Sequence, residues 1–257
     1  HTFTHKFVVN LSDRVRAINQ TTTFSGGLDI VQNAAANGRT YDPQTGITTN
    51  QYENVSGNWS AWAQVQWGRN LDKANHFYVE VFPVASFDHS VDVSAVTSEA
   101  DRLSKVNTWT LKNTARLHYQ YDQFSMGINC AVKYLASRSE RAYFQPLNTW
   151  EYNYGLTAQY TFPWRLQVAT DLKMYSRRGY TDSSMNADEL VWNASLSYPF
   201  WKNRFVLRLE GFDLLSKLSN VYYSVNAQGQ TEMWRNCVPS YVMLHVGWKF
   251  HRMSKQR

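Results

Sequence analysis

The sequence contains no uninterrupted run of 18 apolar residues, and its mean hydropathy is −0.50. A membrane-spanning α-helix needs about 20 predominantly apolar residues in a row, so helical membrane proteins are excluded. Charged residues are scarce, at 18% of 257 residues, whereas aromatic residues reach 15%. This combination is unusual for a soluble domain. An outer-membrane β-barrel fits it, because alternation along the strands makes the average hydropathy polar.

The sequence also has few residues that suggest chemistry. Its two cysteines, Cys130 and Cys237, fall in an expected strand and an expected loop, too far apart for a disulfide. Neither the cysteines nor the histidines have the spacing of metal ligands. There is no P-loop, GxGxxG or GxSxG motif, and no nucleophile stands beside a base. We therefore expect no metal and no cofactor, and we predict that the protein is not an enzyme.

The net charge of +6 is spread rather than clustered. Basic residues occur singly along the expected strands, so we do not expect nucleic acid as a partner. An excess of basic residues is suited to the lining of a pore, or to a surface that contacts anionic lipopolysaccharide. We expect lipid and lipopolysaccharide of a Gram-negative cell outer membrane to surround the protein.

Apolar residues recur with a period of two. Near the C-terminus Val242, Leu244 and Val246 share one face, whereas Met243 and His245 share the other. The alternation returns near residues 3–11, 109–119, 124–134, 151–162, 165–174, 192–200 and 204–210. Residues 17–33 and 47–67 are polar on both faces, and 75–92 are apolar on both, which indicates strands that extend beyond a membrane. We predict an all-β fold, a transmembrane antiparallel β-barrel with about eleven strands here.

The expected connections alternate between short and long. Short ones fall near residues 12–16, 69–74, 122, 163 and 202–203. Long ones fall near residues 34–46, 93–104, 138–148, 177–188 and 214–239. Short periplasmic turns and long extracellular loops alternate in this way in outer-membrane barrels. The long loops are where we expect most contacts with a ligand.

Tryptophans lie at the ends of the expected strands and predict an aromatic girdle. Trp109, Trp150 and Trp192 are expected at the outer end. Trp67, Trp164, Trp201 and Trp248 are expected at the short-turn end. Amphipathic rings gather at the two membrane interfaces of such barrels, whereas a soluble sandwich has no reason to place tryptophan there.

An odd number of strands cannot close on itself in an antiparallel barrel. We therefore expect residues 1–257 to form one barrel portion that strands from elsewhere complete. Large outer-membrane transporters have about 22 strands around a plug, so this portion would be the C-terminal half. The chain opens HTFTHKFVVNL, which already resembles a strand and not a signal peptide. We expect a processed or partial chain for that reason.

Charged residues on the polar face of the strands are the candidate functional residues, because they would face the lumen. They are Lys112, Arg116, Lys133, Asp171, Lys173, Arg208, Glu210 and Lys249. They could contact a plug or guide a substrate, or they could pair with one another in a wet lumen. The spacing of Asp171 with Lys173, and of Arg208 with Glu210, allows such pairs. Arg177 and Arg178, at an outer strand end, could contact an anion or anchor a loop.

Residues 149–250 resemble a known family. The segments are TWEYNYGLTAQYTFPWRLQVATDLKMYSRRGY, ELVWNASLSYPF, FVLRLEGFDLLSKLSNV and VPSYVMLHVGWKF. They are similar to the C-terminal end of the TonB-dependent-receptor-like outer-membrane β-barrels of Bacteroidetes-type bacteria. The matching motifs are structural: Arg178, Gly179 and Tyr180 begin a loop, Gly211, Phe212 and Asp213 end a strand, and Phe250 closes the last strand. A basic tail after Phe250 departs from the family's terminal phenylalanine.

The resemblance implies a barrel filled by an N-terminal plug and energised by TonB, with no plug segment in this chain. The leading hypothesis is the wall of a TonB-dependent receptor that transports a ligand too large for porins. The alternative is a non-energised structural or interaction barrel that anchors surface lipoproteins or serves secretion or adhesion. A barrel enzyme and a soluble β-sandwich are the remaining alternatives. Fold likeness alone is a weak reason to assign function.

Overall fold

The protein is described by a computed structural model that covers residues 1–41, 44–93, 103–139, 146–181, 183–218, 221–226, 229–234, 238 and 240–249. Cys237 and Phe250, both considered above, lie outside these residues. Within them, no helix has the length and apolar character to cross a membrane. The helical segments are two short 3-10 turns, η1 (Arg16–Ile18) and η3 (Ser183–Met185).

Eleven strands form one large antiparallel sheet, as the alternation predicted. Each strand pairs with its neighbours in chain order, except where a separate hairpin intervenes. The strands are β1 (Phe3–Val15), β2 (Gln20–Gln32), β5 (Asn58–Asn70), β6 (Phe77–Val93), β7 (Leu103–Tyr121), β8 (Phe124–Ser139), β9 (Leu147–Thr161), β10 (Gln167–Arg178), β11 (Asp188–Phe200), β12 (Phe205–Phe212) and β15 (Tyr241–Trp248). The fold is therefore all-β and dominated by this sheet.

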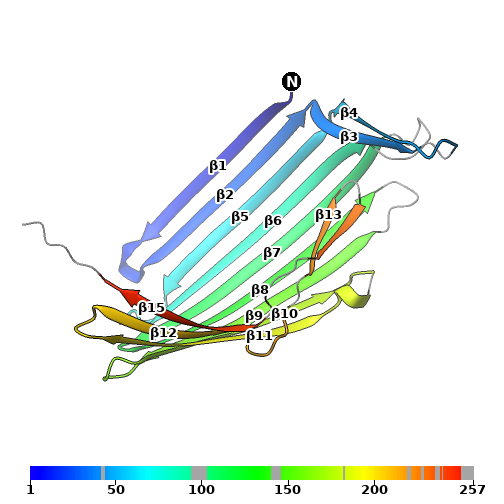
Figure 1. The fold of residues 1–257 in the computed structure, drawn as a ribbon. Coiled ribbons are helices and arrows are strands. Elements are labelled where there is room, and N and C mark those ends of the chain that lie inside the picture. The colour runs from blue at the N-terminus through cyan, green and yellow to red at the C-terminus, as the bar shows by residue number, and fades with distance from the viewer. Residues whose placement is uncertain are drawn as a thin grey trace, which may run out of the picture.

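The sheet curls but does not close. Figure 1 shows β9 to β12 and β15 turning out of the plane of β1 to β7, so the sheet has a concave and a convex side. Among the described strands, β1 pairs only with β2 and β15 only with β12. Ten antiparallel steps separate these edges, so β1 and β15 run in the same direction and could pair only in parallel. That geometry explains why the eleven strands stay open.

Two hairpins lie outside the large sheet, in segments that the sequence predicted as long loops. They are β3 (Ala34–Tyr41) with β4 (Thr48–Val55), and β13 (Val221–Asn226) with β14 (Gly229–Trp234). The connections predicted near 34–46 and 214–239 therefore contain short hairpins of their own, which the sequence analysis did not predict. Ala36 and Val55 pack with Val93 of β6 in a small buried cluster at the base of the first hairpin. Figure 1 shows that this hairpin extends beyond the end of the sheet.

Four of the short connections lie at or next to the predicted positions, whereas the first lies at residues 16–19 and not at 12–16, because β1 continues to Val15. Local hydrogen bonds explain one of these turns well. In the turn between β5 and β6, the Asp72 carboxylate accepts the backbone N–H groups of His76 (3.1 Å) and Phe77 (2.9 Å). The bond from Phe77 is the main reason that the pKa of Asp72 is lowered. Asn75 completes the turn with a φ of +62°, a conformation that asparagine tolerates.

The pairing register sets the two faces of the sheet. Leu172 of β10 lies opposite Leu156 of β9 and Trp192 of β11. The next residue, Asp171, lies opposite Thr157 and Asn193. Because side chains alternate along a strand, each apolar row lies on one face and each polar row on the other. The predicted alternation therefore holds across neighbouring strands as well as along each strand.

No second sheet covers the apolar face within the described part of the chain. Val242, Leu244 and Val246 of the edge strand β15 are 66%, 61% and 68% exposed. A soluble β-sandwich would bury these side chains against a second layer. The described residues therefore leave this apolar row uncovered.

Candidate functional site

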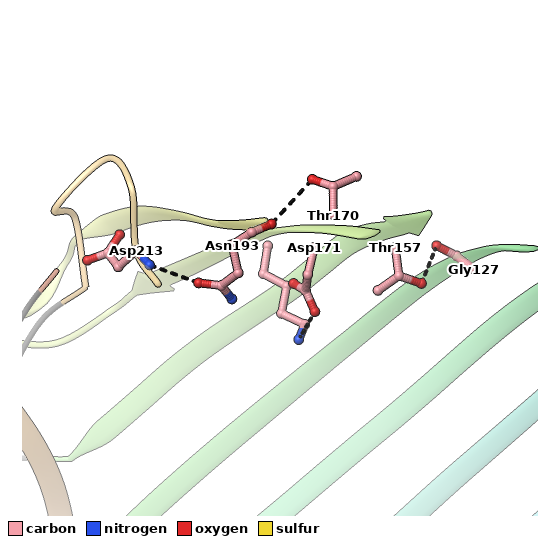
Figure 2. Close-up of polar contacts among 7 residues, drawn as sticks. Gly127, Thr157, Thr170, Asp171, Asn193 and Asp213 are labelled. Atoms are coloured by element: carbon pink, nitrogen blue, oxygen red, sulfur yellow. Dashed lines mark hydrogen bonds and ion pairs between the residues drawn. The ribbon is translucent and has the colours of Figure 1, made fainter. Parts of the chain in front are cut away.

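The polar face lies on the concave side of the sheet. Figure 2 shows Thr170 and Asp171 projecting to opposite sides of β10, with Asp171 on the side toward which the sheet curls. The same figure shows Thr157 donating its hydroxyl to the carbonyl of Gly127, a bond of 3.4 Å between β9 and β8. Polar side chains on this face therefore link neighbouring strands in addition to the backbone hydrogen bonds of the sheet.

Register brings most of the predicted lumen-facing residues to this polar face. Lys112 and Arg116 lie on β7, Lys133 on β8, Asp171 and Lys173 on β10, and Arg208 and Glu210 on β12. Lys249 follows the last residue of β15, and its backbone N–H donates to the carbonyl of Arg204 at 2.8 Å. The set spans the sheet from β7 to β15, so it forms a charged surface and not one compact centre.

Two ion pairs that the spacing allowed are present. Lys173 Nζ lies 2.7 Å from Asp171 Oδ2, and Arg208 Nη2 lies 3.1 Å from Glu210 Oε1. His245 of β15 also approaches Glu210, at 3.3 Å. The second oxygen of Asp171, Oδ1, is buried and accepts no hydrogen bond from the described residues.

Two further pairs, which sequence reasoning missed, join different strands. Arg116 Nη1 lies 3.3 Å from Glu80 Oε2 of β6, and Lys133 Nζ lies 3.1 Å from Glu151 Oε1 of β9. Gln66 Nε2 donates to the other oxygen of Glu80 at 2.7 Å. Glu80 and Glu151 could be identified as partners only from the register between strands. Alternation along one strand gives no information about that register.

A polar network anchors the loop after β10. Arg177 forms an ion pair with Glu189 of β11, and both side chains are mostly buried. The Tyr180 hydroxyl donates to Glu151 Oε1 at 3.2 Å. Burial, followed by the negative charge of Glu151, raises the pKa of Tyr180 to about 12. Arg177 is therefore held in a mostly buried ion pair beside this loop.

The second arginine of this segment is held by a carboxylate. Arg178 Nη2 donates to both oxygens of Asp188, at 2.9 and 2.7 Å. Both side chains are about half exposed, so solvent screens this pair. Its geometry fixes the ends of β10 and β11 beside each other.

Aromatic rings line the convex face near both ends of the strands. Phe87 lies 4.6 Å from Trp109 and 4.9 Å from Trp59, between ring centroids. Trp150 lies 4.6 Å from Tyr134, and Trp192 Nε1 donates to Thr170 Oγ1 at 2.9 Å. Trp59, Phe87, Trp109 and Trp150 lie toward the end where the long connections emerge, whereas Trp192 lies opposite Leu172, near the middle of β10. Trp59, which the sequence analysis did not single out, extends the predicted outer group to β5.

The short-turn end has its own aromatic group. Phe205 stacks with Trp201 at 5.5 Å and with Trp248 at 5.4 Å. Trp164 lies in the turn between β9 and β10, and Trp67 lies near the end of β5. Two aromatic groups therefore border the exposed aliphatic side chains between them.

The described residues contain no cluster of three or more His, Cys, Asp or Glu side chains that could hold a metal ion. Many of their charged groups are arranged as ion pairs along the polar face of the sheet. In comparisons with known proteins, no family model, no curated protein and no solved structure matches the chain.

Proposed function

We propose that this sheet is part of the wall of an outer-membrane β-barrel in a Gram-negative cell. Its convex face meets lipid and its concave face lines an aqueous lumen. The observation that supports this best is the exposed apolar face with aromatic rings at both of its borders. In water, each Å² of such apolar surface costs about 25 cal/mol, whereas hydrocarbon accepts it without that cost.

The height of the apolar band agrees with a bilayer. Trp192 and Phe200 are eight residues apart on the same face of β11. At about 3.3 Å per residue this is roughly 26 Å of strand. A tilt of about 40° reduces the height to roughly 20 Å, close to the apolar band of about 25 Å in such barrels.

The two open edges indicate what must complete the barrel. In lipid, each unpaired backbone group would cost several kcal/mol, so both β1 and β15 need partners. Because these edges run in the same direction, the completing segment must begin and end with strands of the opposite direction, and its strand number is odd. A second copy of this sheet in the same membrane orientation could pair with these edges only in parallel, so it could not complete an antiparallel barrel. Eleven further strands of another sequence would give about 22, the size of a plugged transporter.

Transport of a ligand too large for porins, energised by TonB, is the function we propose for this barrel. The resemblance of residues 149–250 and the half-barrel size support it, and a plug and TonB would be partners. The alternative is a non-energised barrel that binds surface lipoproteins or a secretion or adhesion assembly. The β3–β4 hairpin favours that alternative, because it extends past the sheet and has its own buried cluster.

Energy dependence separates the two functions. Cells with the intact gene and cells without it are given a mixture of solutes too large for porins, and solute loss from the medium is measured. We expect some solutes to be taken up only with the gene, and a protonophore to stop their uptake at the outer membrane. Glycerol, which needs no energy to cross a porin, is the control. Gene-dependent entry that persists with the protonophore would contradict TonB-energised transport.

A further inference from the structure

A hollow of 540 Å³ lies in the middle of the sheet, between β7 and β10, with most of its lining side chains on the polar face. Two small residues of β8, Gly127 and Ala131 four residues further along, form part of its lining. A Cβ at Gly127 would lie 2.7 Å from Thr157 Oγ1, so glycine at this position makes room for the threonine hydroxyl. The hollow falls within the usual size of small-molecule sites, about 300–1,000 Å³.

The side chains around the hollow are basic and carry no carboxylate. Lys112 and Arg116 of β7 and Lys173 of β10 line it, together with His118. Asn129 and Asn153 add amide groups that can donate hydrogen bonds. Outside the lining, Glu80 holds Arg116 at 3.3 Å and Asp171 holds Lys173 at 2.7 Å. These carboxylates fix two cations at the border of the hollow.

Lys112 gives this surface its net positive charge. It lies directly opposite Lys133 in the β7–β8 register. Like charges in that arrangement destabilise a sheet. Glu151 neutralises Lys133 at 3.1 Å, whereas no ion pair to Lys112 is found among the described residues. Lys112 is exposed, so an approaching anion can reach its ammonium group.

We propose that this hollow binds an anionic solute with carboxylate or phosphate oxygens as it passes along the wall. The inference rests on the proposed function, because it takes the polar face to be the wall of a water-filled lumen. Lys112 supplies the unpaired charge, Arg116 and Lys173 border the site, and the two asparagines orient the oxygens. An anionic group is favoured because the lining offers the unpaired cation of Lys112, two further cations held in ion pairs, and several hydrogen-bond donors.

The test is a calorimetric titration of the full chain in detergent micelles with citrate, with inorganic phosphate, and with uncharged glucose. We expect saturable binding of at least one of the two anions and none of glucose. Lys112→Gln should weaken the binding by about threefold or more, in keeping with loss of one exposed charge contact. Ala131→Leu should abolish it by filling the hollow. Raising the salt concentration should weaken it too.

Lys6→Gln is the matched control, since it removes the same charge from the same face at the edge strand β1, beside Asp29 at 3.8 Å. It should bind the anion as the unchanged chain does. Equal weakening by Lys6→Gln and Lys112→Gln would overturn the proposal, and so would the absence of saturable binding. Insertion into lipid vesicles is measured separately, so a chain that inserts but binds no anion contradicts this inference and leaves the proposed barrel intact.

Discussion

Replacing Leu196 by arginine is expected to destabilise the membrane-inserted protein by about 2–4 kcal/mol, the cost of an arginine facing lipid near the middle of a bilayer. Leu196 is 43% exposed and lies opposite Val168 of β10 and Leu209 of β12, within the apolar band of the convex face. Urea titration of folding into phospholipid vesicles, followed by tryptophan fluorescence, measures this change in free energy.

The neighbouring residue provides the control. Ser195 is on the opposite face of the same strand, beside Glu210 of β12, where an arginine would meet water and a carboxylate. Ser195→Arg should therefore change the free energy of unfolding by less than about 1 kcal/mol. If the two arginine variants lose equal stability, or if Ser195→Arg loses more, the assignment of lipid to the convex face is wrong.

Replacing Asp213 by alanine is expected to cost about 3 kcal/mol. Asp213 is fully buried, and its carboxylate accepts the backbone N–H groups of Lys217 at 3.2 Å and Leu218 at 2.8 Å. Alanine loses both of these partly buried hydrogen bonds, and a hydrogen bond to a charged group contributes roughly 1.5–3 kcal/mol. The φ of Asp213 is +43°, which costs alanine more than aspartate. The same urea titration measures the loss.

Asp213→Asn is the matched variant, because it keeps one side-chain oxygen as an acceptor and tolerates the positive φ. We expect it to lose less than half of what alanine loses. Figure 2 shows the second anchor of this segment, the Asn193 side chain, whose oxygen accepts the Asp213 N–H at 2.8 Å. A loss below about 0.5 kcal/mol for Asp213→Ala would show that this turn does not stabilise the connection after β12.

The strands and their two faces could be predicted because a period of two is a local property of the sequence. The row that contains Leu172 and Trp192 was assigned to the apolar side before any pairing was known. The charges opposite that row were assigned in the same way. Partners across strands could not be predicted, because the pairs Arg116–Glu80 and Lys133–Glu151 depend on a register between strands.

Departures from alternation were harder to interpret. The β3–β4 hairpin was predicted as a loop, since GRTYDPQTGITTN consists largely of turn-forming and polar residues. Residues 75–92, which are apolar on both faces, contain Pro83, yet β6 pairs with β7 along all of its length. On its other side β6 pairs with β5, and that pairing is interrupted at Val65 and Gln66. These two residues lie beside Pro83, which has no backbone N–H to donate. Tertiary pairing therefore accommodated the proline on one side of the strand.

Spin-label accessibility along β11 tests the two-faced wall most directly. Single cysteines are placed from Leu190 to Ser197 in a background in which both native cysteines, Cys130 and Cys237, are replaced by serine. They are then labelled, and the chain is inserted into lipid vesicles. Leu190, Trp192, Ala194 and Leu196 share the convex face in the register, whereas Val191, Asn193, Ser195 and Ser197 share the concave one. Labels at even-numbered positions should then collide mainly with oxygen, which concentrates in lipid, and labels at odd-numbered positions mainly with a water-soluble nickel complex. Equal access of the nickel complex to both sets would contradict the membrane wall.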